Sequence, residues 1–315
     1  MGCGTWAWGN RFLWGYTEEM DDQLRAVFNR CVRNGVTLFD TGDSYGTGRL
    51  NGRSEFLLGR FTRDYGGPNQ AKICIATKLA AYPWRWSRRS MVSACNASAR
   101  RLERPVDLVQ MHWSPANYAP WQEGPLLDGL ADLYEQGLVK AVGLSNYGPK
   151  RLRRVQRKFA ERGIPIATLQ VQYSLLSTYP LTTLAVKEVC DEFGIRLIAY
   201  SPLALGILTG KYSEQGPFPK GLRGRLFRQL VPGAKPLLQT LRAVATAQQK
   251  TMAQVAINWC MTKGAIPIPG AKTVEQAQQN IGALGWCLGA GEVAELDQAA
   301  ASVDKAMVQN IFQTR

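Results

Sequence analysis

The chain has 315 residues, with 38 lysines and arginines against 24 aspartates and glutamates, so its formal net charge is +14 at pH 7. Its residues are 45% hydrophobic and 20% charged, which is typical of a globular protein and excludes a largely disordered chain. No apolar run approaches the roughly 20 residues of a transmembrane helix. Residues 1–14 also lack the basic and apolar regions of a signal peptide, so we expect neither a membrane partner nor an export signal.

One histidine and seven cysteines restrict the chemistry further. Zinc sites built from two or three imidazoles are excluded, and any step that needs an imidazole must use His112. The cysteines are odd in number and never form Cys-x-x-Cys, which predicts buried free thiols in a reducing compartment. They are Cys3, Cys31, Cys74, Cys95, Cys190, Cys260 and Cys287.

The positive charge could indicate nucleic-acid binding. The densest basic cluster, however, places six lysines and arginines between residues 150 and 158, in a segment with a helical pattern. A basic helix face exposed to solvent explains this cluster better. We therefore expect no nucleic-acid partner.

Strand patterns recur along the chain, each after a stretch that is compatible with a helix. Apolar or β-branched runs of this kind are typical of strands buried on both faces. Eight such strands are predicted near residues 3–6, 36–40, 73–77, 106–111, 138–143, 166–171, 195–200 and 265–268. Five junctions contain a glycine, which ends a helix readily because it adopts a left-handed conformation: Gly35, Gly137, Gly163, Gly194 and Gly264.

Eight strands alternating with amphipathic stretches, such as residues 21–34, predict an α/β fold with a closed (β/α)8 barrel. We expect one domain over residues 1–315, with a long irregular loop after strand seven, at about 206–236, and a C-terminal helix. The alternative is an open doubly wound sheet, which usually shows Gly-x-Gly-x-x-Gly after its first strand. The one match, at 289–294, lies too near the end of the sequence to begin such a unit.

Reactive side chains follow the ends of successive predicted strands, where a barrel places its active site. Asp40 and Tyr45 follow strand two, Lys78 ends strand three, and His112 ends strand four. Buried Lys78 needs a charge partner, and Asp40 is the obvious one. A nearby ammonium lowers the pKa of a phenol, so we expect Tyr45 beside Lys78 to be a general acid. His112 could hydrogen-bond a substrate oxygen.

The motifs at these strand ends resemble those of the aldo-keto reductases over nearly the whole chain. They are Phe-Asp-Thr-Gly-Asp-Ser-Tyr-Gly at 39–46, Ala-Thr-Lys at 76–78, Gln-Met-His-Trp at 110–113, Val-Gly-Leu-Ser-Asn-Tyr at 142–147 and Ile-Pro-Ile-Pro-Gly-Ala-Lys at 266–272. Residues 79–85 and 281–286 are most similar to plant and plastid members, including pyridoxal reductases. A chloroplast location is implied by this resemblance alone, and a cytoplasmic one is expected otherwise.

The resemblance implies a catalytic tetrad of Asp40, Tyr45, Lys78 and His112, with NADPH reducing an aldehyde or ketone and Tyr45 protonating its oxygen. Asp40 also belongs to the implied cofactor site. The resemblance adds Ser145, Asn146 and Gln170 for the carboxamide and Tyr200 for the nicotinamide ring. Further implied cofactor residues are Gly4, Thr5, Trp6, Ser201, Pro202, Leu203, Gly206, Lys211, Arg223, Gly270, Lys272, Gln276, Gln279 and Asn280. Lys272, beside a helix N-terminus, suits a 2′-phosphate and hence NADPH over NADH.

Other classes of protein fit the sequence less well. A serine hydrolase needs Gly-x-Ser-x-Gly, and residues 143–147 lack its second glycine. A P-loop fails at 52–54, where arginine replaces the lysine. A cofactor-binding sensor with little turnover, resembling potassium-channel beta subunits, stays open as an alternative.

Tryptophans and a tyrosine near the predicted mouth indicate the kind of substrate. Trp84 and Trp113 are the expected substrate contacts, and Trp6, Tyr82 and Trp86 lie in the same loops. An aromatic wall suits a planar carbonyl compound such as pyridoxal. The alternative is that these rings pack loops onto the barrel, and short aliphatic aldehydes stay possible.

Overall fold

A computed structural model describes residues 1–213, 216–304, 307 and 310–314. Its strands form one eight-stranded, all-parallel sheet in which each strand pairs with its neighbour in the sequence. All eight predicted strands are confirmed. They are β1 (Cys3–Gly4), β2 (Leu38–Asp40), β3 (Cys74–Leu79), β4 (Val106–Met111), β5 (Val139–Ser145), β6 (Ile166–Gln172), β7 (Arg196–Tyr200) and β8 (Ile266–Pro267).

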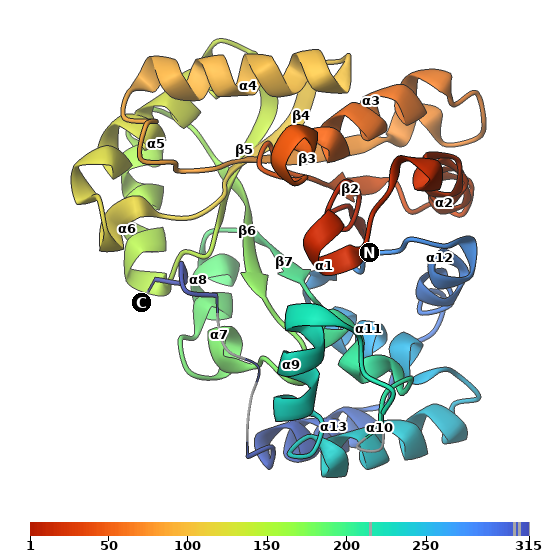
Figure 1. Ribbon diagram of the computed structural model, residues 1–315. Helices are drawn as coiled ribbons and strands as arrows, with labels where there is room; N and C mark the ends of the chain where they lie inside the picture. The colour runs from red at the N-terminus through yellow and green to blue at the C-terminus, as the bar shows by residue number, and fades with distance from the viewer. Residues whose placement is uncertain (214–215, 305–306, 308–309, 315) are drawn as a thin grey trace.

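The sheet closes between its first and last strands. The Gly2 amide donates to the Pro267 carbonyl at 2.9 Å, and the Gly4 amide donates to the Pro269 carbonyl at 3.2 Å. A parallel bridge also joins Gly4 to Gly270. The predicted (β/α)8 barrel is therefore confirmed, with the strands at the centre and the helices around them (Figure 1).

The helices alternate with the strands, and the five predicted glycine stops all have positive φ, between 67° and 81°. Their bounds are α1 (Arg11–Trp14), α2 (Asp21–Arg33), α3 (Arg53–Asp64), α4 (Arg88–Leu102), α5 (Pro120–Glu135), α6 (Pro149–Ala160), α7 (Tyr179–Thr182), α8 (Val186–Glu192), α9 (Gly221–Leu230), α10 (Lys235–Ala247), α11 (Met252–Thr262), α12 (Val274–Ile281) and α13 (Ala290–Ala301). Short 3-10 turns are η1 (Glu18–Met20), η2 (Gly48–Leu50), η3 (Gln70–Lys72), η4 (Pro115–Asn117) and η5 (Ala204–Thr209).

The insert after β7 is not the irregular loop that the sequence predicts, because it contains η5 and α9. Two glycines in α9 lower its helix propensity, so the sequence pattern did not predict this helix. Phe227 and Leu230 lie on the buried face of α9. A Cβ on Gly224 would lie 1.8 Å from the Pro219 carbonyl oxygen, so the close packing there requires glycine. The predicted C-terminal helix is confirmed as α13.

The core consists of apolar side chains between the sheet and the helices. Helix α2 is typical, because Leu24, Val27, Phe28, Cys31 and Val32 share its buried face. All seven cysteines are free, as predicted, but Cys287 is exposed and Cys74 only half-buried. No helix in the described part of the chain combines the length and apolarity needed to cross a membrane.

Candidate active site

The four predicted catalytic residues meet at the carboxyl ends of β2, β3 and β4. The Lys78 ammonium forms an ion pair with Asp40, and both side chains are almost completely buried. The Lys78 Nζ lies 4.8 Å from the centre of the Tyr45 ring. The Tyr45 and His112 rings pack edge to face with their centres 5.8 Å apart. The structure thus brings together residues that lie up to 72 positions apart in the sequence.

The carboxylate of Asp40 is held by more than its ion pair. Its Oδ2 accepts hydrogen bonds from Gln170 Nε2 at 2.7 Å and Gln110 Nε2 at 3.2 Å. A buried carboxylate needs several such donors, because it has lost the water that would solvate its charge. Burial also lowers the pKa of Lys78, and the attraction of Asp40 opposes that effect.

The prediction that Lys78 lowers the pKa of Tyr45 is wrong for this structure. Burial raises the pKa of Tyr45 well above its ordinary value, and the negative charge of Asp40 raises it further. Asp40 neutralises Lys78, so the ammonium has little net effect on the phenol. The hydroxyl of Tyr45 forms no hydrogen bond to the described residues. It is therefore a protonated, unpaired donor at neutral pH.

The imidazole of His112 is neutral at physiological pH. Burial lowers its pKa well below the ordinary value, and the positive charge of Lys78 lowers it further. A neutral imidazole carries one N–H and can donate one hydrogen bond to a ligand. Its backbone is fixed, because the carbonyl accepts from Asn146 Nδ2 at 3.1 Å and the amide donates to Leu79 at 3.0 Å.

The residues expected to bind a carboxamide lie beside the tetrad but also bond to one another. Asn146 Nδ2 donates to Ser145 Oγ at 3.1 Å, and Asn146 Oδ1 accepts from the Tyr200 hydroxyl at 2.9 Å. The side-chain amide nitrogen of Gln170 already donates a hydrogen bond to Asp40. Ser145 can still donate its own hydroxyl proton, and Tyr200 presents a partly exposed ring at the end of β7.

The segment after β7 contains an unusual run of left-handed residues. Ser201, Ala204 and Leu205 have φ values of 52°, 47° and 57°, and Gly206 has 108°. Each non-glycine residue in this conformation costs about 1–2 kcal/mol, so the surrounding structure must hold the turn in place. Arg223 Nε does so by donating to the Leu205 carbonyl at 3.1 Å. Pro202 is buried and Leu203 is half-buried in the same turn.

Three predicted cofactor residues form a cationic cluster. The charges of Arg223 and Lys211 lower the pKa of Lys272, although burial lowers it more. The Lys272 ammonium donates to the Trp14 carbonyl at 2.7 Å, and the Arg223 guanidinium stacks 4.6 Å from the centre of a Trp14 ring. Three neighbouring cations with no carboxylate partner among the described residues fit a phosphorylated ligand.

Some of the remaining predicted residues hydrogen-bond to the backbone, and several have an exposed surface. Thr5 is completely buried, and its hydroxyl donates to the Asp40 carbonyl at 2.9 Å, so it is not exposed to a ligand. Asn280 Nδ2 donates to the Gly270 carbonyl at 3.3 Å, and Gln276 Oε1 accepts from the Lys272 amide at 2.7 Å. Residues with an exposed or partly exposed surface are Gly4, Trp6, Gly270, Gln276 and Gln279.

A continuous run of aromatic rings leads from the tetrad to the rim. The centres of the His112 and Trp113 rings lie 4.8 Å apart, and Tyr82 packs edge to face on Trp113 at 6.2 Å. Tyr82 in turn stacks on the exposed Trp84 at 4.5 Å. The structure thus brings both predicted substrate residues into one wall that starts beside Tyr45.

The C-terminal segment contributes residues that the sequence analysis missed. Phe312 stacks on Trp113 with ring centres 4.5 Å apart, and Asn310 Nδ2 donates to the Tyr200 hydroxyl at 3.0 Å. Thr314 Oγ1 accepts from the Gly148 amide at 2.8 Å, so the chain ends near α6 (Figure 1). No local motif could have revealed these contacts, because they join residues more than 100 positions apart.

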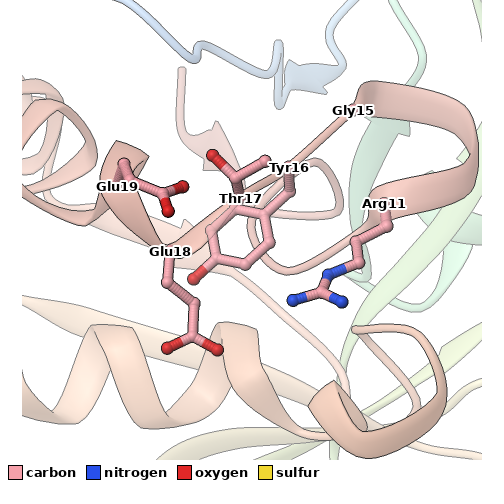
Figure 2. A pocket seen from close by; sticks show the side chains of 6 residues that line it. All are labelled: Arg11, Gly15, Tyr16, Thr17, Glu18 and Glu19. Atoms are coloured by element: carbon pink, nitrogen blue, oxygen red, sulfur yellow. The ribbon is translucent and has the colours of Figure 1, made fainter.

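A cavity of about 660 Å³ opens elsewhere on the molecule and contains none of the tetrad. Figure 2 shows the ring of Tyr16 between the side chains of Arg11 and Glu18. The Tyr16 hydroxyl donates to Asp21 at 2.6 Å, and burial raises the pKa of Tyr16 to about 12. The Tyr16 hydroxyl also accepts from Arg53, and we assign the cavity no part in catalysis because none of the predicted site residues lines it. Its lining is Arg11, Gly15, Tyr16, Thr17, Glu18 and Glu19.

Comparison with known proteins agrees with this geometry. Residues 1–301 match the model of the aldo/keto reductase family. The chain is 54% identical to the chloroplastic pyridoxal reductase of Arabidopsis thaliana, covering 100% of this chain and 87% of the relative. It is 27% identical to the L-glyceraldehyde 3-phosphate reductase of Escherichia coli K12, covering 91% and 86% of the two chains.

A solved structure shows the same fold. The glycerol dehydrogenase of Gluconobacter oxydans superposes with a TM-score of 0.80 at 24% identity, covering 99% of this chain and 94% of that chain. At this identity the likeness supports the barrel and no particular substrate. Together with the family match, these findings show that the chain belongs to the aldo/keto reductase family and is an oxidoreductase that acts on the carbonyl groups of small molecules.

Proposed function

We propose that this protein reduces a planar aldehyde, with pyridoxal as the first candidate, to the alcohol and uses NADPH as the reductant. The observation that carries this proposal is the unpaired hydroxyl of Tyr45, which lies beside the Asp40–Lys78 pair and the neutral ring of His112. The 54% identity to a pyridoxal reductase supports the choice of substrate. Because that relative is chloroplastic, we propose the chloroplast as the location.

The chemistry requires a hydride, a proton and a fixed carbonyl group. NADPH, when bound, supplies the hydride to the carbonyl carbon. Tyr45 donates its phenolic proton to the oxygen as negative charge develops there, and the resulting tyrosinate regains a proton from solvent. Its raised pKa keeps the phenol protonated, and transfer remains favourable because an alkoxide is a stronger base than a phenolate.

Other residues stabilise this arrangement. The imidazole N–H of His112 donates to the same oxygen and so stabilises its charge most strongly in the transition state. The Lys78 ammonium, 4.8 Å from the Tyr45 ring centre, balances the charge of Asp40 and so limits the repulsion between that carboxylate and the tyrosinate formed after proton transfer. Asp40 keeps that ammonium in place. Ser145, Asn146, Gln170 and Tyr200 would hold the nicotinamide, and Lys211, Arg223 and Lys272 its phosphates.

Tyr45→Phe is the direct test. It removes only the hydroxyl, so we expect kcat for pyridoxal to fall by about 10²- to 10⁴-fold, while the dissociation constant for NADPH stays unchanged. Turnover is measured as loss of NADPH absorbance and binding as quenching of protein fluorescence. Wild-type turnover in the variant would contradict the assignment of Tyr45 as the acid.

The same assay separates an enzyme from a cofactor-binding sensor. Wild-type protein is mixed with NADPH and a panel of aldehydes that includes pyridoxal, benzaldehyde and propanal. We expect consumption of NADPH, with kcat/KM higher for the two ring-containing aldehydes than for propanal because the rings can pack on Trp113 and Tyr82. Tight NADPH binding without consumption on any aldehyde would favour the sensor.

A further inference from the structure

The side chain of His112 has a single hydrogen-bonding contact among the described residues. Its Nδ1 lies 3.3 Å from the hydroxyl oxygen of Ser44, which immediately precedes Tyr45. Its Nε2 has no such partner in the described part of the chain. The His112 ring also contacts the Tyr45 and Trp113 rings, whose centres lie 5.8 and 4.8 Å from its own centre. Ser44 is therefore the one described group positioned to select which nitrogen carries the proton.

The choice of nitrogen matters because the ring is neutral. Burial keeps the pKa of His112 well below its ordinary value, so the imidazole has one N–H and one bare nitrogen at neutral pH. If the proton is on Nε2, the ring can donate to a carbonyl oxygen. If the proton is on Nδ1, Nε2 has only a lone pair and would repel that oxygen. A group that fixes the tautomer therefore affects catalysis without touching the substrate.

The chemistry of the two groups favours one direction for this hydrogen bond. The Ser44 hydroxyl oxygen lies 3.3 Å from Nδ1 of His112. A bare imidazole nitrogen is a good acceptor, and a better one than a hydroxyl oxygen. Donation from Ser44 to Nδ1 is therefore favoured over donation from Nδ1 to the hydroxyl oxygen, and it leaves the imidazole proton on Nε2.

We propose that Ser44 is a positioning residue that holds His112 in the tautomer with its proton on Nε2. The inference deepens the proposed carbonyl reduction and rests on it for its catalytic consequence.

The test uses the fact that His112 is the one histidine in the sequence. In protein labelled with ¹⁵N-histidine, the two ring nitrogens of His112 give the only ring signals, apart from any purification tag. At pH 7 we expect wild-type protein to show a protonated Nε2 and an unprotonated, hydrogen-bonded Nδ1. Ser44→Ala should move both shifts toward a mixture of tautomers, and Ser44→Thr, which keeps the hydroxyl, should restore the wild-type pattern.

A tyrosine variant provides a control for the loss of a nearby hydroxyl. Tyr118→Phe removes a rim hydroxyl that bonds Trp113 and Ala81, and we expect no change in the His112 signals. A wild-type proton on Nδ1, or a Ser44→Ala spectrum identical to wild type, would overturn the proposal.

Kinetics provide the catalytic readout. We expect Ser44→Ala to lower kcat for pyridoxal by about three- to tenfold, with the dissociation constant for NADPH unchanged and Ser44→Thr restoring kcat. The spectra are recorded without substrate, so the two proposals fail separately. A shifted tautomer in a protein that reduces no aldehyde would overturn the proposed function alone. Unshifted signals in an active enzyme would overturn the role of Ser44 alone.

Discussion

At the residue scale, the site is built from buried polar groups whose charges are compensated inside the protein. Asp40 has Lys78 and two glutamine amides as partners, whereas the phenol of Tyr45 has none among the described residues. This asymmetry separates the residues that organise the site from the residue that reacts. Burial raises the pKa of Tyr45, the charge of Asp40 raises it further, and the nearby ammonium does not offset them because it is already neutralised.

Asp43 is a second buried carboxylate, in the loop that carries Tyr45. It pairs with Arg85, whose guanidinium also lies 5.0 Å from the centre of the Tyr82 ring. Its Oδ1 accepts from the Ala80 amide at 3.2 Å. Burial nevertheless raises the pKa of Asp43 from 3.8 to about 6, against the opposing effect of Arg85.

This raised pKa predicts a specific pH dependence of stability. Between about pH 4 and 6 the folded protein holds the Asp43 proton and the unfolded chain does not. The contribution of Asp43 to the free energy of unfolding therefore falls as pH rises through this range, by about 3 kcal/mol in total. We expect Asp43→Asn to remove this slope, measured as the difference between urea unfolding curves of variant and wild type from pH 4 to 7. Parallel pH profiles for the two proteins would show that Asp43 titrates normally.

At the scale of single elements, the barrel places its functional groups through the ends of strands and the starts of helices. The cationic cluster joins two such elements: Arg223 bonds to Leu205 in the left-handed turn after β7, and Lys272 lies just before α12. The Thr273 hydroxyl accepts from the Gln276 amide at 3.3 Å and so caps α12. The free amides of this first turn and the Lys272 ammonium together attract an anion.

Lys272→Glu tests this element. Reversal of the charge replaces an attraction to the 2′-phosphate of NADPH by a repulsion, and NADH has no phosphate at that position. We expect the dissociation constant for NADPH to rise by about 10- to 100-fold more than that for NADH, measured by fluorescence titration. Lys250→Glu, at a lysine that lies over Trp286, is the charge-matched control. An equal rise for both cofactors would remove Lys272 from the phosphate site.

At the scale of the whole molecule, the C-terminal segment completes the mouth of a barrel that is formed by other parts of the chain. Residues 310–314 contact Trp113, Asn146 and Tyr200, which come from the ends of three different strands. The segment lies outside the sheet and its covering helices, so we expect the barrel to fold without it.

Deletion of residues 310–315 should therefore leave a folded enzyme with an altered substrate site. We expect KM for pyridoxal to rise by about two- to tenfold, because Trp113 loses its stacking partner, with a smaller change for propanal. Circular dichroism and thermal unfolding check that the barrel persists, and Phe312→Leu isolates the loss of the ring. An unchanged KM in both variants would show that the segment has no part in substrate binding.

The sequence alone determined the order of the strands, the closed barrel and the gathering of Asp40, Tyr45, Lys78 and His112 at one mouth. These features follow from local patterns, since apolar runs specify strands, glycines end helices, and parallel strands bring their carboxyl ends together. Helix α9 was missed because its glycines resemble those of a loop, although Phe227 and Leu230 give it a buried face.

Only the tertiary structure decided the direction of the Tyr45 pKa, the contact between Ser44 and His112, and the position of Phe312 on Trp113. A pKa depends on burial and on the distance to charges from other strands, which no single motif specifies. Likewise, Phe312 meets a residue about 200 positions earlier only after the barrel has formed. The sequence thus specified which groups gather at the mouth, and folding decided how they are protonated, oriented and covered.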